Sequence, residues 1–394
     1  MKKLTTFVCT ALAVGSVSAQ TLIQAYKNRA DLVSQTNITT NLQQFSNLGI
    51  KTTGSVNNVN TLTWIKNKYT SFGYSASQIA EDPFTFGSTS SKNLVITKTG
   101  TLYPNKYVII CGHFDTITGP GTSDNGSGTS VILEVARILK DVPTEYSIKF
   151  IHFSGEEQGL YGSAHYANNV EFQSGVRKLD IKLVFNLDQV GGKIGNVNNK
   201  IICERDTSGQ SGNNAASNTV TQQLATCTTL YSPLQTSISN AYSSDYMPFE
   251  QKGDVITGFY EYTRSYNEHT TNDTFANVDP VYVFKVAKAA VGAMQHFATA
   301  SSTVPPVSAS KEKPLTTLES VKMYPNPAKN ILNIEWPDSG TGNFTVEITN
   351  LSGLSMLKDE NTSQLNISSL KNGIYLCTVN KQGSSVTRKI IIEK

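Results

Sequence analysis

Three apolar stretches of this chain each lead into side chains that commonly bind divalent metals. The stretches are residues 107–111, 148–153 and 181–187. The side chains that follow them are His113, the neighbours Glu156 and Glu157, and Asp188. Short continuous apolar runs are typical of strands buried on both faces of a parallel sheet. Ligands of such sheets gather beyond the carboxyl ends of the strands, so the pattern predicts that these side chains meet at one edge.

The segments between the apolar stretches have the spacing of amphipathic helices. Helices are expected at residues 58–69, 127–140, 159–168 and 281–298. Strands that alternate with helices predict an α/β fold, with a mainly parallel central sheet flanked by helices. We place this domain at residues 56–299.

The first 19 residues are expected to be a signal peptide. Met1-Lys2-Lys3 precedes an apolar run over 7–17, and the small residues at 17–19 suit cleavage before Gln20. An uncleaved membrane anchor is the alternative. No later stretch reaches the roughly 18 apolar residues of a membrane span, so no transmembrane segment is predicted. Residues 20–55 are polar with weak helical spacing, and we interpret them as a propeptide or as an N-terminal helix covering the sheet.

The pattern changes after the first domain. Residues 300–317 contain several Ser, Thr and Pro without periodicity, which is typical of a linker. Short β-type runs follow at 331–334, 344–348, 374–379 and 386–392. Turn residues separate these runs, so residues 318–394 are predicted to form a small all-β sandwich domain.

Charge and cysteine content narrow the class of protein further. The net charge is +3, and no run of Lys and Arg indicates a nucleic-acid surface. Without Cys9 the exported chain keeps Cys111, Cys203, Cys227 and Cys377. This even count permits disulfides, and Cys203 with Cys227 is the more plausible pair. Buried free thiols are the alternative.

Five residues in five segments form a candidate metal site. They are His113, Asp124, Glu157, Asp188 and His269. Zinc accepts imidazole nitrogen and carboxylate oxygen, and two ions roughly 3.5–4 Å apart need about five ligands if one carboxylate bridges them. Glu156 is then a spare carboxylate beside the ligands. Individually these residues have plainer explanations, since Asp124 or Ser127 could cap a helix, and Glu156 and Glu157 could be a solvated acidic turn.

The five segments occur in the order of a known family. They are Gly112-His113-Phe114-Asp115, residues 123–128, residues 156–163, Leu187-Asp188 and residues 269–274. Over roughly residues 90–300 the chain resembles the bacterial secreted leucyl-aminopeptidase-like family of two-zinc exopeptidases, which implies a zinc-exopeptidase fold.

The resemblance implies a role for each residue. His113 and Asp188 would bind one zinc, Glu157 and His269 the other, and Asp124 both. Asp115 would orient His113, because a ligating imidazole usually donates its other nitrogen to a carboxylate. Glu156 would be the general base. In Ser243-Ser244-Asp245-Tyr246 the tyrosine replaces the histidine of a family segment, and the remaining histidines, His152, His165 and His296, are interpreted as structural.

The C-terminal domain has a resemblance of its own. Residues 323–330, 370–375 and 387–394 are similar to the type A sorting domains that the type IX secretion system of Bacteroidetes recognises. The alternative is a β module that binds carbohydrate or protein.

Together these features predict a secreted, monomeric zinc aminopeptidase, extracellular or at the cell surface. Its partners would be peptide or protein N-termini and, through the C-terminal domain, the secretion machinery. Alternatives on the same fold are a carboxypeptidase, for which Arg264 is the evident carboxylate-binding residue, and a glutaminyl cyclase, which would hold one zinc. A non-catalytic adhesin or scaffold should lack at least one ligand or the base.

Overall fold

The computed structural model describes residues 20–208, 212–303, 321–335, 343–350, 355–381 and 384–394. The chain forms two compact units, residues 1–303 and 304–394, which are described separately below. The expected signal peptide and linker residues 304–317 lie outside the described residues.

An eight-stranded sheet runs through the first unit, in the order β1-β2-β4-β3-β7-β10-β8-β9. The strands are β1 (Ile79–Phe86), β2 (Thr89–Lys98), β3 (Tyr103–His113), β4 (Tyr146–Phe153), β7 (Asp180–Leu187), β8 (Lys200–Arg205), β9 (Gln235–Asn240) and β10 (Ile256–Glu261). The four central strands, β4, β3, β7 and β10, are parallel, whereas β1, β2 and β8 join by antiparallel pairing. The predicted α/β fold with a mainly parallel sheet is confirmed.

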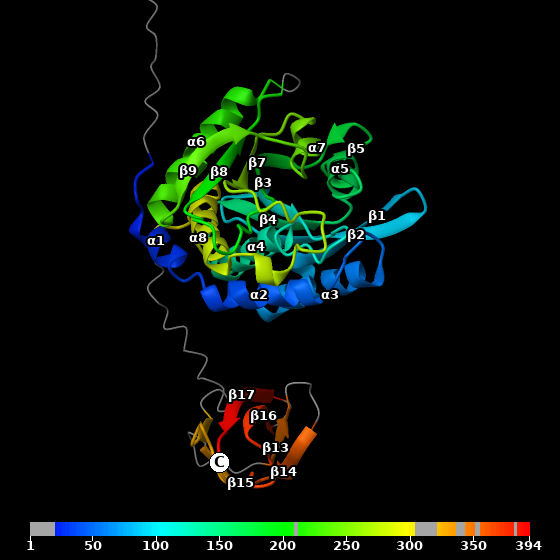
Figure 1. The fold of residues 1–394 in the computed structure, drawn as a ribbon. Helices are drawn as coiled ribbons and strands as arrows, with labels where there is room; N and C mark the ends of the chain where they lie inside the picture. The colour runs from blue at the N-terminus through cyan, green and yellow to red at the C-terminus, as the bar shows by residue number, and fades with distance from the viewer. Residues whose placement is uncertain (1–19, 209–211, 304–320, 336–342, 351–354, 382–383) are drawn as a thin grey trace, which may run out of the picture. The chain divides into compact units, whose positions relative to one another are not determined.

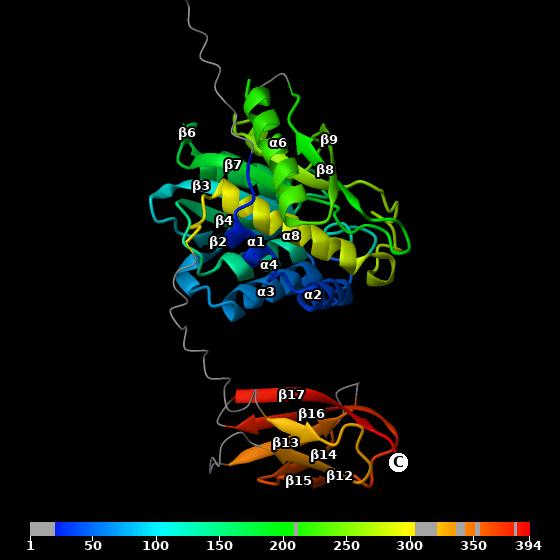
Figure 2. The same ribbon diagram turned by 90° about the vertical axis from the view of Figure 1, so that its left-hand side faces the viewer.

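Helices cover both faces of this sheet (Figures 1 and 2). On one face lie α4 (Gly126–Leu139), α6 (Asn214–Tyr231) and α8 (Pro280–Phe297), and on the other α5 (Tyr161–His165) and α7 (Met247–Glu250). Successive side chains of β3 point to opposite faces of the sheet and enter two different hydrophobic clusters. Val108 and Ile110 are buried in the larger hydrophobic cluster with α4 and α8, whereas Ile109 and Cys111 are buried with Phe249 in the smaller one. Strands buried on both faces explain the continuous apolar runs.

The segment at 20–55 folds as part of the first unit. It contains α1 (Gln24–Ala30) and α2 (Gln35–Asn47), and α3 (Val56–Ser71) follows. Ser34 caps α2 by accepting a hydrogen bond from the Asn37 amide at 3.2 Å. The buried face of α2 packs on α4 and α8, so this segment covers helices and not the sheet, as Figure 1 shows.

The first and last segments of this unit hold each other. The Tyr26 hydroxyl donates a hydrogen bond to the Ala300 carbonyl, and the Arg29 guanidinium donates to the Ser301 carbonyl at 2.8 Å. Ala300 also forms an isolated β-bridge with Thr144. Placing the start of the linker at residue 300 is therefore wrong, because residues 300–301 are bonded to the first unit.

The second unit is a β-sandwich. Its strands are β11 (Lys322–Tyr324), β12 (Ile331–Glu335), β13 (Phe344–Thr349), β14 (Ser355–Glu360), β15 (Gln364–Asn366), β16 (Gly373–Lys381) and β17 (Ser384–Ile392). They form two antiparallel sheets, β11-β12-β15 and β14-β13-β16-β17, which share one hydrophobic cluster. The predicted small all-β architecture is confirmed.

The Cys203–Cys227 disulfide that the even cysteine count permitted is not formed. Cys111, Cys203, Cys227 and Cys377 are all free and buried in the described part of the chain. Cys203 and Cys227 are buried in the larger hydrophobic cluster, where thiols pack as small apolar groups. Within the described residues, no helix combines the length and hydrophobicity needed to span a bilayer.

Candidate active site

The parallel strands bring the predicted metal-binding residues to one edge of the sheet. His113 is the last residue of β3, Asp188 directly follows β7, and Glu157 lies in the turn beyond β4. Asp124 precedes α4, and His269 comes from the loop after β10. Asn125 caps α4, accepting from the Gly128 amide at 2.9 Å, which leaves the Asp124 carboxylate available to the site.

The first group of possible metal ligands consists of His113, Asp124 and Asp188. The Nε2 atom of His113 lies 3.2 Å from Asp124 Oδ1 and 3.2 Å from Asp188 Oδ1. All three residues are buried. One imidazole and two carboxylates are a donor set that suits zinc.

The second group consists of Asp124, Glu157 and His269. The Nε2 atom of His269 lies 3.2 Å from Asp124 Oδ2 and 2.8 Å from Glu157 Oε2. Asp124 thus turns one oxygen toward each histidine, and this is the arrangement that a bridging carboxylate requires.

The electrostatics of the site favour bound cations. Burial, together with the charge of Asp124, raises the pKa of Glu157 to about 8. Burial also raises the pKa of Glu156 to about 10, and the charges of Asp188, Asp245 and Asp115 add to this shift. Several carboxylates share a volume from which water is largely excluded, so divalent cations would relieve both their repulsion and their desolvation.

A sequence comparison decides the family. The model of peptidase family M28 matches residues 93–294, just over half of the chain. This chain belongs to peptidase family M28. A second model, the secretion system C-terminal sorting domain, matches residues 322–393. We refer to residues 20–303 as the M28 unit.

Curated relatives of the M28 unit include aminopeptidase YwaD from Bacillus subtilis, 34% identical over 170 residues. That match covers 43% of this chain and 35% of the relative, so this chain spans about a third of the relative's length. Another relative, the alkaline phosphatase isozyme conversion protein of Escherichia coli, is 38% identical over 104 residues. That match covers 22% of this chain and 29% of the relative.

Solved structures share the fold at low identity. LapB from Legionella pneumophila is 21% identical with a TM-score of 0.61, over 70% of this chain and 75% of that one. Glutaminyl cyclase from Porphyromonas gingivalis is 17% identical with a TM-score of 0.55, over 67% of this chain and 99% of that one.

Asp115 is placed differently from the expected orienting carboxylate. Its carboxylate oxygen lies 3.8 Å from His113 Nδ1, and the Asp115 backbone carbonyl is closer, at 3.1 Å. The carboxylate instead accepts the backbone amides of Glu156 at 3.3 Å and Glu157 at 3.2 Å. Asp115 therefore joins the His113 strand to the turn that carries both glutamates.

Three further residues, to which the sequence interpretation gave no role, hold the candidate ligands. Asp273 accepts the amides of Ser123 at 2.7 Å and Asp124 at 2.9 Å. The Ser244 hydroxyl donates to Asp188 Oδ2 at 2.7 Å, and the Gln189 amide donates to Asp124 Oδ2 at 3.0 Å. Asp273 stands within the 269–274 motif, so its position was a signal that could have been used.

The N-terminal segment also reaches the site. Lys51 is fully buried, and its ammonium donates to the carbonyls of Gly49 at 2.6 Å and Pro120 at 2.7 Å. The Thr53 hydroxyl donates to Asp115 Oδ2 at 3.1 Å. Residues just before α3 thus brace the segments on which Asp115 and Asp124 lie.

The other histidines and the Ser-Asp-Tyr segment lie outside both ligand groups. His152 shares a hydrogen bond with Tyr69 at 2.8 Å, and His296 with Tyr231 at 2.7 Å, while His165 lies 3.3 Å from Asp82. These contacts agree with structural roles. Asp245 is fully buried, and burial raises its pKa to about 7.

Proposed function

We propose that the M28 unit is a two-zinc aminopeptidase that removes N-terminal residues from peptides. The observation that carries the proposal is the arrangement of two donor groups around a shared Asp124, with the spare carboxylate of Glu156 beside them. The proposed ligands are His113 and Asp188 for one ion, Glu157 and His269 for the other, and Asp124 for both.

Zinc bound by these residues would supply Lewis acidity, both for the scissile carbonyl and for the attacking water. Glu156 would take a proton from that water and return it to the leaving amine. The backbone amide of Glu156 donates a hydrogen bond to the Asp115 carboxylate, and the Glu156 carboxyl group belongs to neither donor group. Glu156 would thus be a base next to the ligands that is not itself a ligand.

The alternatives fit the structure less well. A carboxypeptidase needs a free cation for the substrate carboxylate, but the Arg264 guanidinium is paired with the Glu268 carboxylate. A one-zinc cyclase needs a single donor group, whereas two are present. A degenerate scaffold should lack a ligand or the base, and all of them are retained.

A panel of aminoacyl p-nitroanilides, assayed with and without a chelator, tests this proposal. We expect hydrolysis of several members, loss of activity after zinc is removed by chelation, and recovery when zinc is added back. An N-acylated member of the panel is the matched control, because an aminopeptidase requires a free amine. Equal hydrolysis of the blocked and free substrates would contradict exopeptidase action at the N-terminus.

We further propose that the second unit directs export and takes no part in catalysis. It carries none of the proposed ligands, and its cluster of buried residues is separate from the core of the M28 unit. The match to a sorting domain supports this division, and transport through a type IX secretion system would place the enzyme outside the cell.

A chain that ends after Thr303 should keep the activity of the full chain within about twofold, because its contacts to residues 300–301 remain. In the native host the shortened chain should stay inside the outer membrane. Aminopeptidase activity in culture supernatants of the two strains measures this. Equal secretion would contradict the sorting role, and an inactive purified short chain would show that the second unit supports catalysis.

A further inference from the structure

A cavity opens beside the candidate metal ligands. It has a volume of about 340 Å³, and Gln189, Glu204, Tyr242, Tyr260 and Arg264 are among its lining residues. Gln189 connects the two sites, since it follows Asp188 in sequence and donates a hydrogen bond to Asp124 Oδ2 at 3.0 Å. The Tyr260 hydroxyl donates to Gln189 Oε1 at 3.1 Å. A substrate group bound at the metal ligands is therefore next to this cavity.

Glu204 gives the cavity its chemical character. It lies on β8 with Ile202, and alternation along the strand points both side chains to the cavity, while Cys203 is buried in the core. Glu204 is only 2% exposed, whereas the Arg264 side chain is 50% exposed. The carboxyl group thus lies deep in the cavity, and the guanidinium lies near its opening.

Two neighbouring residues accommodate this carboxyl group. The Tyr246 hydroxyl donates to Glu204 Oε2 at 3.0 Å and accepts the Tyr242 amide at 2.9 Å. Gly258 pairs directly with Glu204 across β8 and β10. A Cβ atom at residue 258 would lie 2.7 Å from Glu204 Oε2 and 2.8 Å from Tyr246 Cε1, so the glycine leaves room for this pair of side chains. Tyr246, which departs from the family pattern, therefore has a function as the partner of Glu204.

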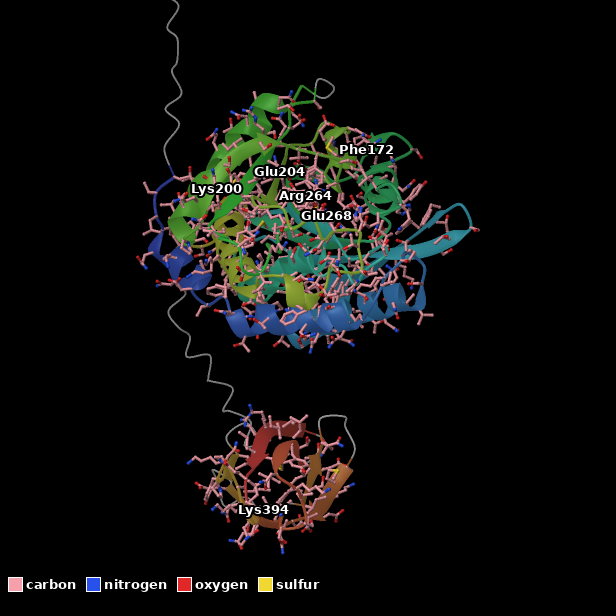
Figure 3. The ribbon with its side chains drawn as sticks, viewed as in Figure 1. Phe172, Lys200, Glu204, Arg264, Glu268 and Lys394 are labelled. Atoms are coloured by element: carbon pink, nitrogen blue, oxygen red, sulfur yellow. The ribbon has the colours of Figure 1, made fainter. Side chains whose placement is uncertain are left out.

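The cavity becomes negative when Glu204 is ionised. Arg264 is neutralised by its pair with Glu268, and Figure 3 shows these residues with Glu204 in the same region. No ion pair to Glu204 is found among the described residues. Burial raises the pKa of Glu204 to about 8, and the charge of Asp188 adds to this effect. A cation entering the cavity would stabilise the carboxylate form that burial disfavours.

We propose that this cavity receives the side chain of the substrate's first residue, and that Glu204 selects lysine or arginine there. The proposal rests on the aminopeptidase function above. Glu204 is then a specificity-determining residue. It forms an ion pair with the substrate's cationic group while the reaction takes place at the metal ligands. A long, flexible basic side chain can reach a deep carboxylate, whereas an aliphatic residue leaves it without a charged partner.

The test compares lysine with norleucine, which has a similar aliphatic chain without the ammonium group. For the zinc-loaded full chain we expect kcat/KM to be at least about tenfold higher for lysyl than for norleucyl p-nitroanilide, the scale of one charge-assisted hydrogen bond. Glu204→Gln keeps the side-chain shape and an acceptor for Tyr246. It should remove most of this preference, measured as the ratio of kcat/KM for the lysyl and norleucyl substrates, since the ammonium contact is lost.

A binding measurement separates this proposal from the aminopeptidase proposal. Calorimetry of lysinamide and norleucinamide needs no turnover, and we expect tighter binding of lysinamide that Glu204→Gln abolishes. Tyr246→Phe, which removes only the hydroxyl, should reduce the lysine preference by a smaller factor. Norleucyl hydrolysis without a lysine preference would overturn the cavity assignment alone. No hydrolysis of any substrate, with lysinamide still preferred, would overturn the aminopeptidase proposal alone.

Discussion

Replacing Glu156 with glutamine should leave zinc bound and lower kcat by roughly two orders of magnitude or more, the scale of a lost general base. The reason is that Glu156 interacts electrostatically with His113 and Asp188 but belongs to neither donor group. Glutamine keeps the size of the side chain and the backbone bond to Asp115, but it cannot accept the proton of the attacking water. Steady-state kinetics with elemental analysis of the same sample provides the measurement.

The adjacent residue supplies a matched control. Glu157→Gln removes the same charge one position away, at an oxygen that lies 2.8 Å from His269 Nε2. It should lose metal first and activity as a consequence. Near-normal turnover in Glu156→Gln would remove that residue from the role of base, and loss of zinc from it would make Glu156 a ligand.

Asp124→Ala should have the largest effect on metal content, because this carboxylate serves both groups. Its two oxygens each lie 3.2 Å from a different histidine. We expect two zinc ions in the unaltered protein, and we expect weaker binding at both positions in the variant. Removing a residue that hydrogen-bonds a metal ligand typically lowers the metal affinity roughly 10–100-fold. Removing a shared ligand should lower it further.

Variants of the two histidines and of Asp273 complete the comparison. His113→Ala and His269→Ala should each lower activity and weaken mainly the ion of its own group. Asp273→Asn weakens the support of the Ser123 and Asp124 amides and removes a charge near Lys51, so its effect should stay within roughly 10–100-fold in zinc affinity. Zinc titration of the metal-free proteins measures the affinity and stoichiometry of these three variants and of Asp124→Ala. Unchanged stoichiometry in Asp124→Ala would exclude a shared ligand.

The sequence predicted the framework of the fold because its signals are local. Apolar runs marked β3, β4 and β7, and strand ends then placed His113 and Asp188 together. The short helix expected at 159–168 was less accurate, since α5 covers only Tyr161–His165 and a π-helical turn continues to Glu171. Periodicity over so few residues does not distinguish these conformations.

Some supporting contacts were harder to predict than the ligands. Asp273 lies within the 269–274 motif, but its bond to the Asp124 amide, 149 residues away, follows from no spacing rule. Glu204 has no motif around it, and its role emerges only when Gly258 and Tyr246 are placed beside it. The even number of cysteines left a Cys203–Cys227 disulfide and buried free thiols both open, because the count says nothing about their surroundings, and the thiols are free.

The bonds from Tyr26 and Arg29 to residues 300 and 301 join the first and the last parts of the M28 unit to be synthesised. The two partners of the Tyr26 bond are 274 residues apart. A ribosome delivers the N-terminal helix first, but the groups that receive it are the last of the M28 unit to be made. Native contacts that span such distances form late, after the intervening chain is available. These contacts therefore cannot form until nearly the whole unit has been synthesised.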